Sequence, residues 1–380
     1  MVKYHRIGLI RVAFATLIFL TVYPIKADEF FNKALWVVRD HITSKSSIDE
    51  IIQFAEKNNY NVLFVQVRGR GDAYYLSKLV PRTHLLKKNE FDPLQYILKK
   101  VKNKNIKIHA WMNVYYLWSS NQKPFQSDHL LLNHPEWLDN KTPDLIDVEK
   151  VLKLMEKNKK INGEGFYLAP THPEVDAHLQ NVVTELLQNY QLDGIHFDYI
   201  RYHAFGWGMN PIGLNSFLNH SSTMPGLPSL NLQKKPKFSD FKKSAISKFL
   251  EKSSMRIRAY QPNCTISAAV KPNLESAHNN FGQEWDLWLE KGYIDWAVPM
   301  NYTRINKIFK ENISSIKQGL GPDLIENIIM GIGIYNQNYK SAGQKIIETQ
   351  KNNFGGVSIF SYTVFKTDPI YSKKLNKYMD

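Results

Sequence analysis

Eight short runs of β-forming residues recur along the chain, and helical patterns separate most of them. Each run is rich in valine, isoleucine or aromatic residues, and several are apolar throughout, which is typical of strands in a parallel sheet. The repetition therefore predicts eight strands. They are residues 34–40, 62–69, 106–113, 194–201, 265–270, 295–302, 329–335 and 356–362.

Most segments between these runs have the spacing of amphipathic helices. Residues 46–59, for example, place Ile48, Ile51, Ile52 and Ala55 on one helical face. Strands that alternate with helices build parallel βαβ units, and eight such units close a (β/α)8 barrel. A doubly wound open sheet is the alternative, but no glycine-rich dinucleotide loop follows the first strand. We therefore predict an α/β fold, a (β/α)8 TIM barrel.

Two connections are too long to be simple crossovers. They follow the third and fourth predicted strands, and they cover residues 114–171 and 202–236. Both precede a helix, so they lie at the carboxyl-terminal face of the barrel. Loops of this length are usually functional or disordered. We expect them to wall a cleft, and the second, rich in Gly, Pro, Ser and Asn, is a candidate lid.

Residues 1–27 have the pattern of a secretory signal peptide. Lys3, Arg6 and Arg11 precede an apolar run over residues 12–23, and Ala27 stands at a suitable cleavage position. The run is too short to span a bilayer comfortably. An uncleaved anchor is the alternative. We predict that residues 28–380 form one domain, secreted or periplasmic, without stable membrane insertion after cleavage.

Composition agrees with a globular exported protein. Apolar residues make up 43% of the 380-residue chain, which is enough for a large core, and the single cysteine, Cys264, allows no internal disulfide. The net charge is +14, to which the predicted signal peptide contributes four basic residues. A basic surface favours anionic partners. No nucleic-acid motif is present, so we predict a polysaccharide partner and no nucleic acid; a merely solvated lysine-rich surface is the other interpretation.

In (β/α)8 barrels, the active site lies where the strands end. Polar and aromatic residues gather at these positions in the first six predicted strands, and tyrosines end the last two. They are Arg39 and Asp40; Gln66, Arg68, Arg70 and Asp72; His109, Trp111 and Asn113; His196, Asp198, Tyr199, Arg201 and Tyr202; Lys271, Asn273 and Glu275; Asn301 and Tyr302; and finally Tyr335 and Tyr362.

The segment "LDGIHFDYIRY" at residues 192–202 carries two carboxylates, a histidine and an arginine. Side chains alternate along a strand, so His196 and Asp198 face the barrel axis. Asp193 lies at the start of the strand, in a turn, and we interpret it as structural. A buried carboxylate is costly unless it is paired, and such groups are often functional. Asp198 is thus the leading functional candidate, with a structural salt bridge to Arg201 or Arg68 as the alternative.

The third strand repeats this logic, because His109 and Trp111 share one face. His109, His196 and Asp198 are therefore predicted to converge, unless the two histidines are hydrogen-bonded core residues. Aromatic residues also cluster at the predicted strand ends and in the loops that follow. Their rings would stack on sugars while Asn, Arg and Asp side chains bind hydroxyl groups. These aromatics are Trp111, Tyr115, Tyr116, Trp118, Tyr202, Trp207, Tyr302, Tyr335 and Tyr362.

Several segments in order, including "LFVQVRGRGDAYY", "IKIHAWMN", "HPEWL", "LDGIHFDYIRY" and "IDWAVPMNY", resemble the glycosyl-hydrolase-like family 10 proteins, envelope-associated (β/α)8 barrels. The resemblance covers residues 34–362. It implies a glycosidase-type barrel that acts on a polysaccharide, with peptidoglycan glycan strands as one candidate, and it implies that Asp198 is catalytic. Many relatives have two acidic residues at this motif, where this chain has Tyr199 in the second place. The fifth strand departs too, because "SAAVKPN" replaces a Pro-Phe-Gly type of ending.

Glycoside hydrolysis usually requires two carboxyl groups. We expect Asp198 to be the nucleophile or base, held ionised by Arg68 or Arg201. Asp72 is our first choice for the second carboxylate, because "RGRGDAYY" belongs to the resemblance; a loop-capping role is its alternative. Glu275, Asp40 and Glu164 are further candidates. The predicted substrate-binding residues are Arg68, His109, Trp111, Asn113, His196, Arg201, Tyr202, Asn301, Tyr302, Tyr335 and Tyr362.

Two other functions remain open at this point. A sugar-binding barrel without catalysis is suggested by Tyr199 in place of a second acid. A metal-dependent hydrolase would use His109, His196 and Asp198, although the first strand has no His-x-His pair and no helical His/Glu motif is found. The glycosidase hypothesis expects neither a cofactor nor a metal.

Overall fold

The computed structural model describes residues 32–86, 90–156, 164–222 and 237–379. The chain from Phe31 to Asp380 forms one unit. The predicted signal peptide and residues 223–236 of the predicted lid lie outside the described residues. Within the described part, none of the helices is both long enough and apolar enough to cross a membrane.

All eight predicted strands are present, and all pair in parallel, as a (β/α)8 barrel requires. The order in the sheet is β8-β7-β6-β3-β2-β1-β10-β9, and single bridges between Ala297 and Ile328 and between Met300 and Gly331 join its two edges. The predicted fold is therefore confirmed. The strands are β1 (Asn32–Val37), β2 (Val62–Arg68), β3 (Lys107–Asn113), β6 (Gly194–Asp198), β7 (Thr265–Val270), β8 (Trp296–Pro299), β9 (Ile329–Gly333) and β10 (Gly356–Phe360).

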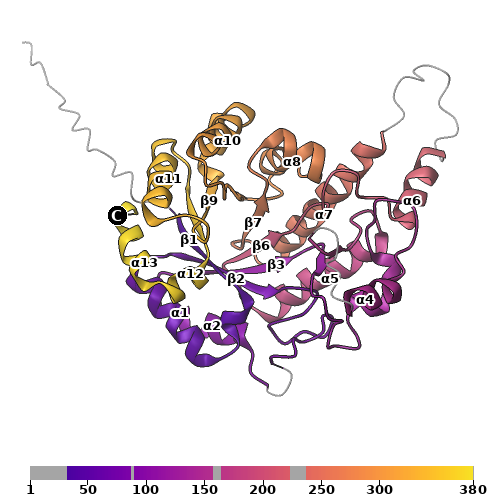
Figure 1. Cartoon of the computed structure of the whole chain (residues 1–380), viewed down its shortest axis with the longest axis horizontal. Coiled ribbons are helices and arrows are strands. Elements are labelled where there is room, and N and C mark those ends of the chain that lie inside the picture. The colour runs from indigo at the N-terminus through magenta and orange to yellow at the C-terminus, as the bar shows by residue number, and fades with distance from the viewer. Residues whose placement is uncertain (1–31, 87–89, 157–163, 223–236, 380) are drawn as a thin grey trace, which may run out of the picture. The chain divides into compact units, whose positions relative to one another are not determined.

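Helices flank the strands on the outside (Figure 1). Local signals explain where they begin: the Ser44 hydroxyl caps α1, and the Asp92 carboxylate caps α2 with Pro93 in its first turn. The helices after the strands are α1 (Lys45–Lys57), α2 (Pro93–Val101), α5 (Pro173–Asn189), α7 (Phe238–Tyr260), α8 (Leu274–Phe281), α9 (Trp285–Glu290), α10 (Asn306–Gly319), α11 (Tyr339–Lys351), α12 (Tyr362–Thr367) and α13 (Pro369–Leu375).

The core has two layers, which follow from the alternation of side chains along the strands. Ile195 and Phe197 of β6 pack outward with the helices, in the large cluster between strands and helices. Trp36, Phe64 and Trp111 fill the interior of the barrel. This is the arrangement predicted from the sequence for β3 and β6.

The first long loop is structured. It contains β4 (Tyr116–Trp118), α3 (Leu130–Asn133), the short 3-10 helix η2 (Pro135–Trp137), α4 (Val148–Glu156) and β5 (Phe166–Tyr167), and β4 and β5 pair antiparallel through Tyr116 and Tyr167. This pairing returns the loop to the mouth of the barrel. In the second long loop, α6 (Pro211–Ser222) is described.

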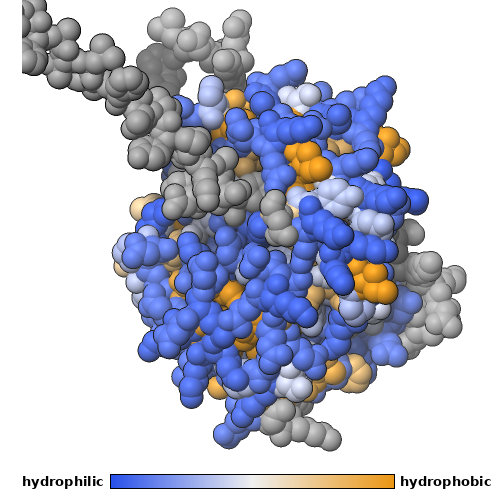
Figure 2. All heavy atoms as spheres, turned by 90° about the vertical axis from the view of Figure 1, so that its left-hand side faces the viewer, coloured by the Kyte–Doolittle hydropathy of each residue, from blue (hydrophilic) through white to orange (hydrophobic). Residues whose placement is uncertain are grey.

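The face over α1, α11 and α13 is largely hydrophilic, and its apolar side chains are dispersed (Figure 2). These helices bury one side only: α1, for example, buries Ile48, Ile51, Ile52 and Ala55, the apolar face predicted from the sequence. Two further 3-10 helices, η1 (Arg39–Ile42) and η3 (Pro322–Asn327), connect elements, and η4 (Asn376–Tyr378) follows α13.

Candidate active site

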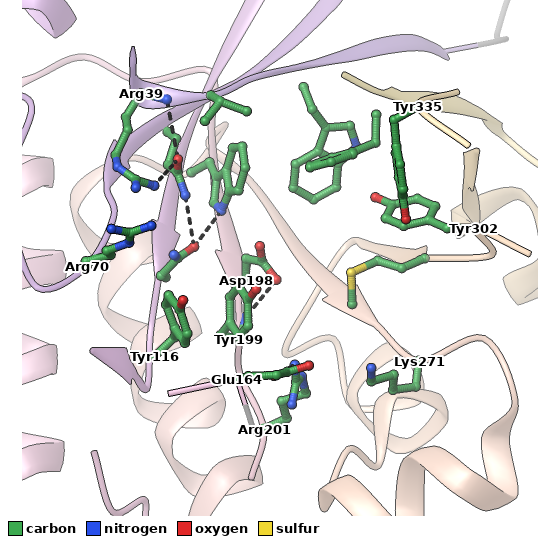
Figure 3. A pocket seen from close by; sticks show the side chains of 17 residues that line it. Arg39, Arg70, Tyr116, Glu164, Asp198, Tyr199, Arg201, Lys271, Tyr302 and Tyr335 are labelled. Carbon is green, nitrogen blue, oxygen red and sulfur yellow. Dashed lines mark hydrogen bonds and ion pairs between the residues drawn. The ribbon is translucent and has the colours of Figure 1, made fainter. Parts of the chain in front are cut away.

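A pocket of about 480 Å³ opens where the barrel strands end. Its walls combine charged groups with aromatic rings (Figure 3). The polar residues that line it are Arg39, Gln66, Arg70, Asn113, Glu164, Asp198, Arg201 and Lys271. The aromatic ones are Trp36, Trp111, Tyr116, Tyr199, Tyr302, Tyr335 and Phe360.

Asp198 is the last residue of β6, and its side chain lies near the centre of the group in Figure 3. It is 6% exposed, and Oδ1 accepts a hydrogen bond of 2.7 Å from the backbone N–H of Tyr199. Burial raises the pKa of Asp198 to about 6, because desolvation outweighs the Tyr199 N–H and the Arg201 charge, which act in the opposite direction. The carboxyl group therefore carries a proton in mildly acidic solution.

Tyr199 turns the chain away from the strand. Its φ angle is +50°, in the left-handed region that residues with side chains rarely adopt. The phenol ring stacks on Tyr116, with ring centroids 4.4 Å apart. A strained residue directly after a buried carboxylate is typical of a functional site.

Glu164 enters the pocket from the long loop, directly before β5. Its Oε2 lies 2.7 Å from Arg201 Nη2 and also accepts a hydrogen bond from the Tyr167 hydroxyl. Burial alone would raise the pKa of Glu164, but the Arg201 charge, these hydrogen bonds and the Lys271 charge lower it below its usual value. The pocket thus holds two carboxyl groups in different environments: the pKa of Glu164 is lowered and that of Asp198 is raised.

Both terminal nitrogens of Arg201 have polar partners in the protein. Its Nη1 donates to the carbonyl oxygens of Tyr202 and His203, at 3.1 and 3.0 Å, and its guanidinium carbon lies 5.0 Å from the Tyr199 ring centroid. The expected pairing of Arg201 with Asp198 is replaced by the Glu164 ion pair. Asp198 consequently has no arginine within ion-pair distance among the described residues, because the Arg201 guanidinium is engaged by Glu164.

Hydrogen bonds connect the polar groups on the wall formed by β2 and β3. Trp111 Nε1 donates to Asn113 Oδ1 at 2.9 Å, and Asn113 Nδ2 donates to the Gly69 carbonyl at 3.0 Å. Gln66 Nε2 reaches the same Asn113 oxygen at 3.4 Å. Asn113 lines the pocket as predicted, but both of its amide atoms are engaged, so it positions its neighbours.

Of the thirteen predicted site residues, the structure brings six to the pocket: Trp111, Asn113, Asp198, Arg201, Tyr302 and Tyr335. Tyr302 stacks on Phe360 with centroids 5.3 Å apart, and its hydroxyl has no hydrogen-bond partner among the described residues. Tyr335 is 58% exposed, so its ring is open to a ligand. These two tyrosines lie together on one side of Asp198 (Figure 3).

Arg68 is turned out of the barrel, contrary to expectation. A bulge in β2 pairs Gln66 with Trp111 but Arg68 with Met112, and Met112 packs outward. A bulge re-aims the side chains that follow it. Arg68 is fully buried, and its Nη1 donates to the Asn113 and Val114 carbonyls.

Asp72 is not among the residues that line the pocket. Its Oδ1 accepts a hydrogen bond of 2.9 Å from the Arg70 backbone N–H. This is the loop-capping role that the sequence left as the alternative. Two of the three further candidates also lie elsewhere: Asp40 has a side chain 66% exposed, and Glu275 is exposed on α8. The third, Glu164, lines the pocket.

The two histidines lie in the barrel interior, below the pocket. His109 stacks on Trp296 with centroids 5.2 Å apart, and burial lowers its pKa to about 3. His196 Nδ1 is 2.8 Å from Ser267 Oγ, and burial lowers its pKa too. Both rings are neutral core groups. Among the described residues, no three His, Cys, Asp or Glu side chains are grouped to hold a metal ion.

Tyr202, Asn301 and Tyr362 are buried outside this pocket. The Tyr202 hydroxyl donates to the Lys242 carbonyl at 3.0 Å, and Asn301 Nδ2 donates to the Phe309 carbonyl at 3.1 Å. These contacts are structural. Conversely, Arg39, Gln66, Arg70, Lys271 and Tyr199 line the pocket without having been assigned a role; their signal was their position at predicted strand ends.

Comparison with known proteins shows similarity to a family of glycosyl hydrolases. The family model "Glycosyl hydrolase-like 10" matches residues 32–348. The glycosyl hydrolase DigH of Escherichia coli K12 is 23% identical over 296 residues, which are 70% of this chain and 59% of that protein. The glycosyl hydrolase YngK of Bacillus subtilis is 20% identical over 71% of this chain and 52% of its own length. The chain thus spans little more than half of these curated relatives.

Solved structures show the same fold. The glycoside hydrolase domain of PgaB (BpsB) from Bordetella bronchiseptica superimposes with a TM-score of 0.65 at 11% identity, covering 92% of this chain and 99% of that one. The catalytic domain of a β-amylase from Paenibacillus polymyxa gives 0.57 at 11% identity, covering 92% and 97%.

Proposed function

Because the chain belongs to the glycosyl hydrolase-like 10 family, we propose that it is an exported glycoside hydrolase that cleaves glycosidic bonds of a polysaccharide. The observation that carries this proposal is the carboxyl pair in one pocket: Asp198 has a raised pKa of about 6, and Glu164 has a lowered one. Two carboxyl groups whose environments separate their pKa values are the usual acid and base of such enzymes.

Asp198 is proposed as the general acid. At pH values below about 6 it holds a proton, and it gives this proton to the glycosidic oxygen as the bond to the anomeric carbon breaks. Glu164 remains ionised beside Arg201 and either accepts a proton from the attacking water or attacks the anomeric carbon itself. Glu164 replaces Asp72 as the proposed second carboxylate, because it lines the pocket and Asp72 does not.

The aromatic rings supply binding. Tyr335 and Tyr302 on one side of Asp198, and Tyr116 elsewhere in the lining, offer rings for contact with sugars. We propose a polysaccharide as the substrate class, with peptidoglycan glycan strands as its first candidate. The proposed export would bring the protein to such a polymer.

The test compares the purified wild-type protein with Asp198→Asn on denuded peptidoglycan glycan strands, chitin oligomers and uronic-acid polysaccharides, with products identified by mass spectrometry. We expect cleavage by the wild type and a loss of about 10²- to 10⁴-fold in the variant. Asp40→Asn is the matched control, because its side chain is 66% exposed and outside the lining. Cleavage that survives in Asp198→Asn would contradict the assignment.

A sugar-binding protein without catalysis is the second candidate. It is favoured by one observation: the Glu164 carboxylate is already engaged by Arg201 in an ion pair of 2.7 Å. Tight binding of one polymer by the wild type, with no product from any substrate, would establish this second function and reject the first.

A further inference from the structure

We propose that Arg39 and Arg70 form a subsite for a carboxylate-bearing sugar unit, beside Asp198. The proposal rests on the proposed function, because it concerns the charge of a substrate bound in the same pocket. Neither arginine had a role in the mechanism above. Both guanidinium groups lie on the same side of the pocket (Figure 3).

The charges that line the pocket do not balance. Arg39, Arg70, Arg201 and Lys271 face only two carboxyl groups, Glu164 and Asp198. Arg201 is already paired with Glu164 at 2.7 Å. The lining therefore has an excess of two positive charges when Asp198 is ionised and three when it is protonated. A pocket of this kind concentrates anionic ligands.

Arg70 has no carboxylate within 4.0 Å of its side-chain nitrogens in the part of the chain that the structure describes. Its backbone, in contrast, is clamped from both sides. The Arg70 N–H donates to Asp72 Oδ1 at 2.9 Å, and its carbonyl oxygen lies 2.6 Å from His129 Nε2. Asp72 and His129 are thus positioning residues for Arg70.

The protonation of His129 supports this clamp. The Leu131 N–H donates to His129 Nδ1 at 3.2 Å, so the ring proton is on Nε2 and is donated to the Arg70 carbonyl. Burial lowers the pKa of His129, which keeps the ring in this neutral form. A loop braced in this way holds its arginine in place before a ligand arrives, which reduces the cost of binding.

Arg39 reaches the same side from the end of β1. Its Nη1 donates to Gln66 Oε1 at 3.0 Å, and its side chain crosses Gly69, where a Cβ would lie 2.5 Å from Arg39 Cδ. Asp40 is a weak partner, since its Oδ1 is 4.0 Å from Arg39 Nε and its side chain is 66% exposed. Arg39 therefore keeps guanidinium hydrogens for a ligand.

The two arginines lie next to each other in Figure 3, and Tyr302 and Tyr335 lie across the pocket, with Asp198 between. A glycan bound across Asp198 would therefore place one sugar against the tyrosines and its neighbour against the arginines. A guanidinium group binds a carboxylate with two parallel hydrogen bonds, and a second guanidinium adds charge. The ligand class is a glycan with a carboxylate on this neighbouring unit.

Binding by the full chain in the Asp198→Asn background tests the subsite without requiring turnover. Isothermal titration would compare a peptidoglycan tetrasaccharide, whose muramic acid units carry a carboxylate, with neutral chitotetraose. We expect the acidic tetrasaccharide to bind at least about tenfold more tightly, the value of one charged hydrogen bond. Adding Arg70→Gln should reduce this preference by about tenfold, and Arg70→Lys should keep part of it.

Arg304→Gln is the matched control, because Arg304 is exposed and outside the lining. Its ratio of affinities for the acidic and neutral tetrasaccharides should equal that of Asp198→Asn alone. Equal affinity for the two tetrasaccharides, or the same loss on both in Arg70→Gln, would overturn the proposal. Because the His129 ring bonds the Arg70 carbonyl, His129→Ala should lower the preference for the acidic ligand while binding of chitotetraose changes less.

Two carboxylate sources fit the same chemistry, and an oligogalacturonate arm separates them. Preference for the acidic tetrasaccharide over oligogalacturonate identifies a lactyl carboxylate, and the reverse identifies a uronic acid; either result supports the subsite. Failure of the proposed function has a different signature, namely absent turnover by the wild type with the binding preference intact.

Discussion

Arg201 Nη2 and Glu164 Oε2 lie 2.7 Å apart, which ties the turn after β6 to the loop that precedes β5. The contact is unequal: the Arg201 side chain is 3% exposed, whereas that of Glu164 is 46% exposed. The arginine is therefore committed to the protein, while the carboxylate still faces the pocket. This geometry leads to the first prediction.

Replacing Arg201 with leucine should raise the pKa of Glu164, because burial would then act without the main opposing charge. If Glu164 must be ionised for catalysis, the acidic limb of the pH profile of kcat/KM moves to higher pH. Measurement of this profile for wild type and Arg201→Leu checks the expectation. Arg256→Leu removes a guanidinium that donates to Thr184, away from the pocket, and should leave the limb in place. An unmoved limb in Arg201→Leu would exclude Glu164 as the base.

The role of Asp198 as an acid predicts a dependence on the leaving group. A substrate with a good leaving group, such as a nitrophenyl glycoside, needs little proton donation. Asp198→Asn should therefore lose about 10²- to 10⁴-fold in kcat on the natural glycan and much less on the activated glycoside. In the wild type, kcat/KM should fall as the pH rises above about 6, because the acid loses its proton. Equal losses on both substrates would indicate a nucleophile instead.

Asp198 also couples stability to pH. Its pKa of about 6 in the folded chain lies above the usual value of 3.8. The folded state thus binds more protons between these pH values, so the stability from this group is complete below pH about 4 and is lost as pH rises through 6. Asp198→Asn lacks this loss. The difference in the free energy of unfolding, variant minus wild type, should therefore increase by about 3 kcal/mol at most between pH 4 and pH 8. Denaturant titrations measure it, and a constant difference would refute the buried-carboxyl account.

Gly71 offers a test of the loop that presents Arg70. Its φ is +74°, and a Cβ would lie 2.6 Å from Leu117 Cδ1 and 2.8 Å from His129 Nε2. Gly71→Ala should cost about 1–3 kcal/mol of stability for the backbone and a similar amount for the clash. Gly292→Ala is the control, with φ +66° and no atom within 4 Å of its Cβ, so it should show only the backbone cost. Equal losses of stability in the two variants would show that the loop around Gly71 shifts to accommodate the added methyl group.

The order of elements could be predicted because it depends on local patterns. Each barrel strand is a run of β-forming residues, and its period of two residues follows from the geometry of the extended chain. For this reason His196 and Asp198 were correctly assigned to the barrel axis. Asp193 was correctly interpreted as structural as well: its Oδ2 accepts a hydrogen bond of 2.8 Å from the Ile108 N–H at the start of β3.

The direction of some side chains could not be predicted, because it depends on how neighbouring strands pair. Arg68 has the right parity for the barrel interior, but the bulge opposite β3 reverses it. A bulge is a property of two paired strands, and one strand's sequence does not reveal it. Asn301 and Tyr362 lie at the ends of their predicted strands, but they are buried by contacts with residues outside those strands: Asn301 Nδ2 donates to the Phe309 carbonyl, and the Tyr362 ring packs beside Phe54.

The sequence by itself determined the barrel, the face at which the polar strand ends gather, and the inward direction of Asp198, because these depend on periodicities of a few residues. Only the tertiary structure decided which charges meet. Glu164 lies 37 residues before Arg201, in a loop without periodicity, and reaches it through the antiparallel pairing of β4 and β5. Contacts of this range depend on packing and on desolvation in three dimensions. The same desolvation raises the pKa of Asp198, which a linear sequence does not display.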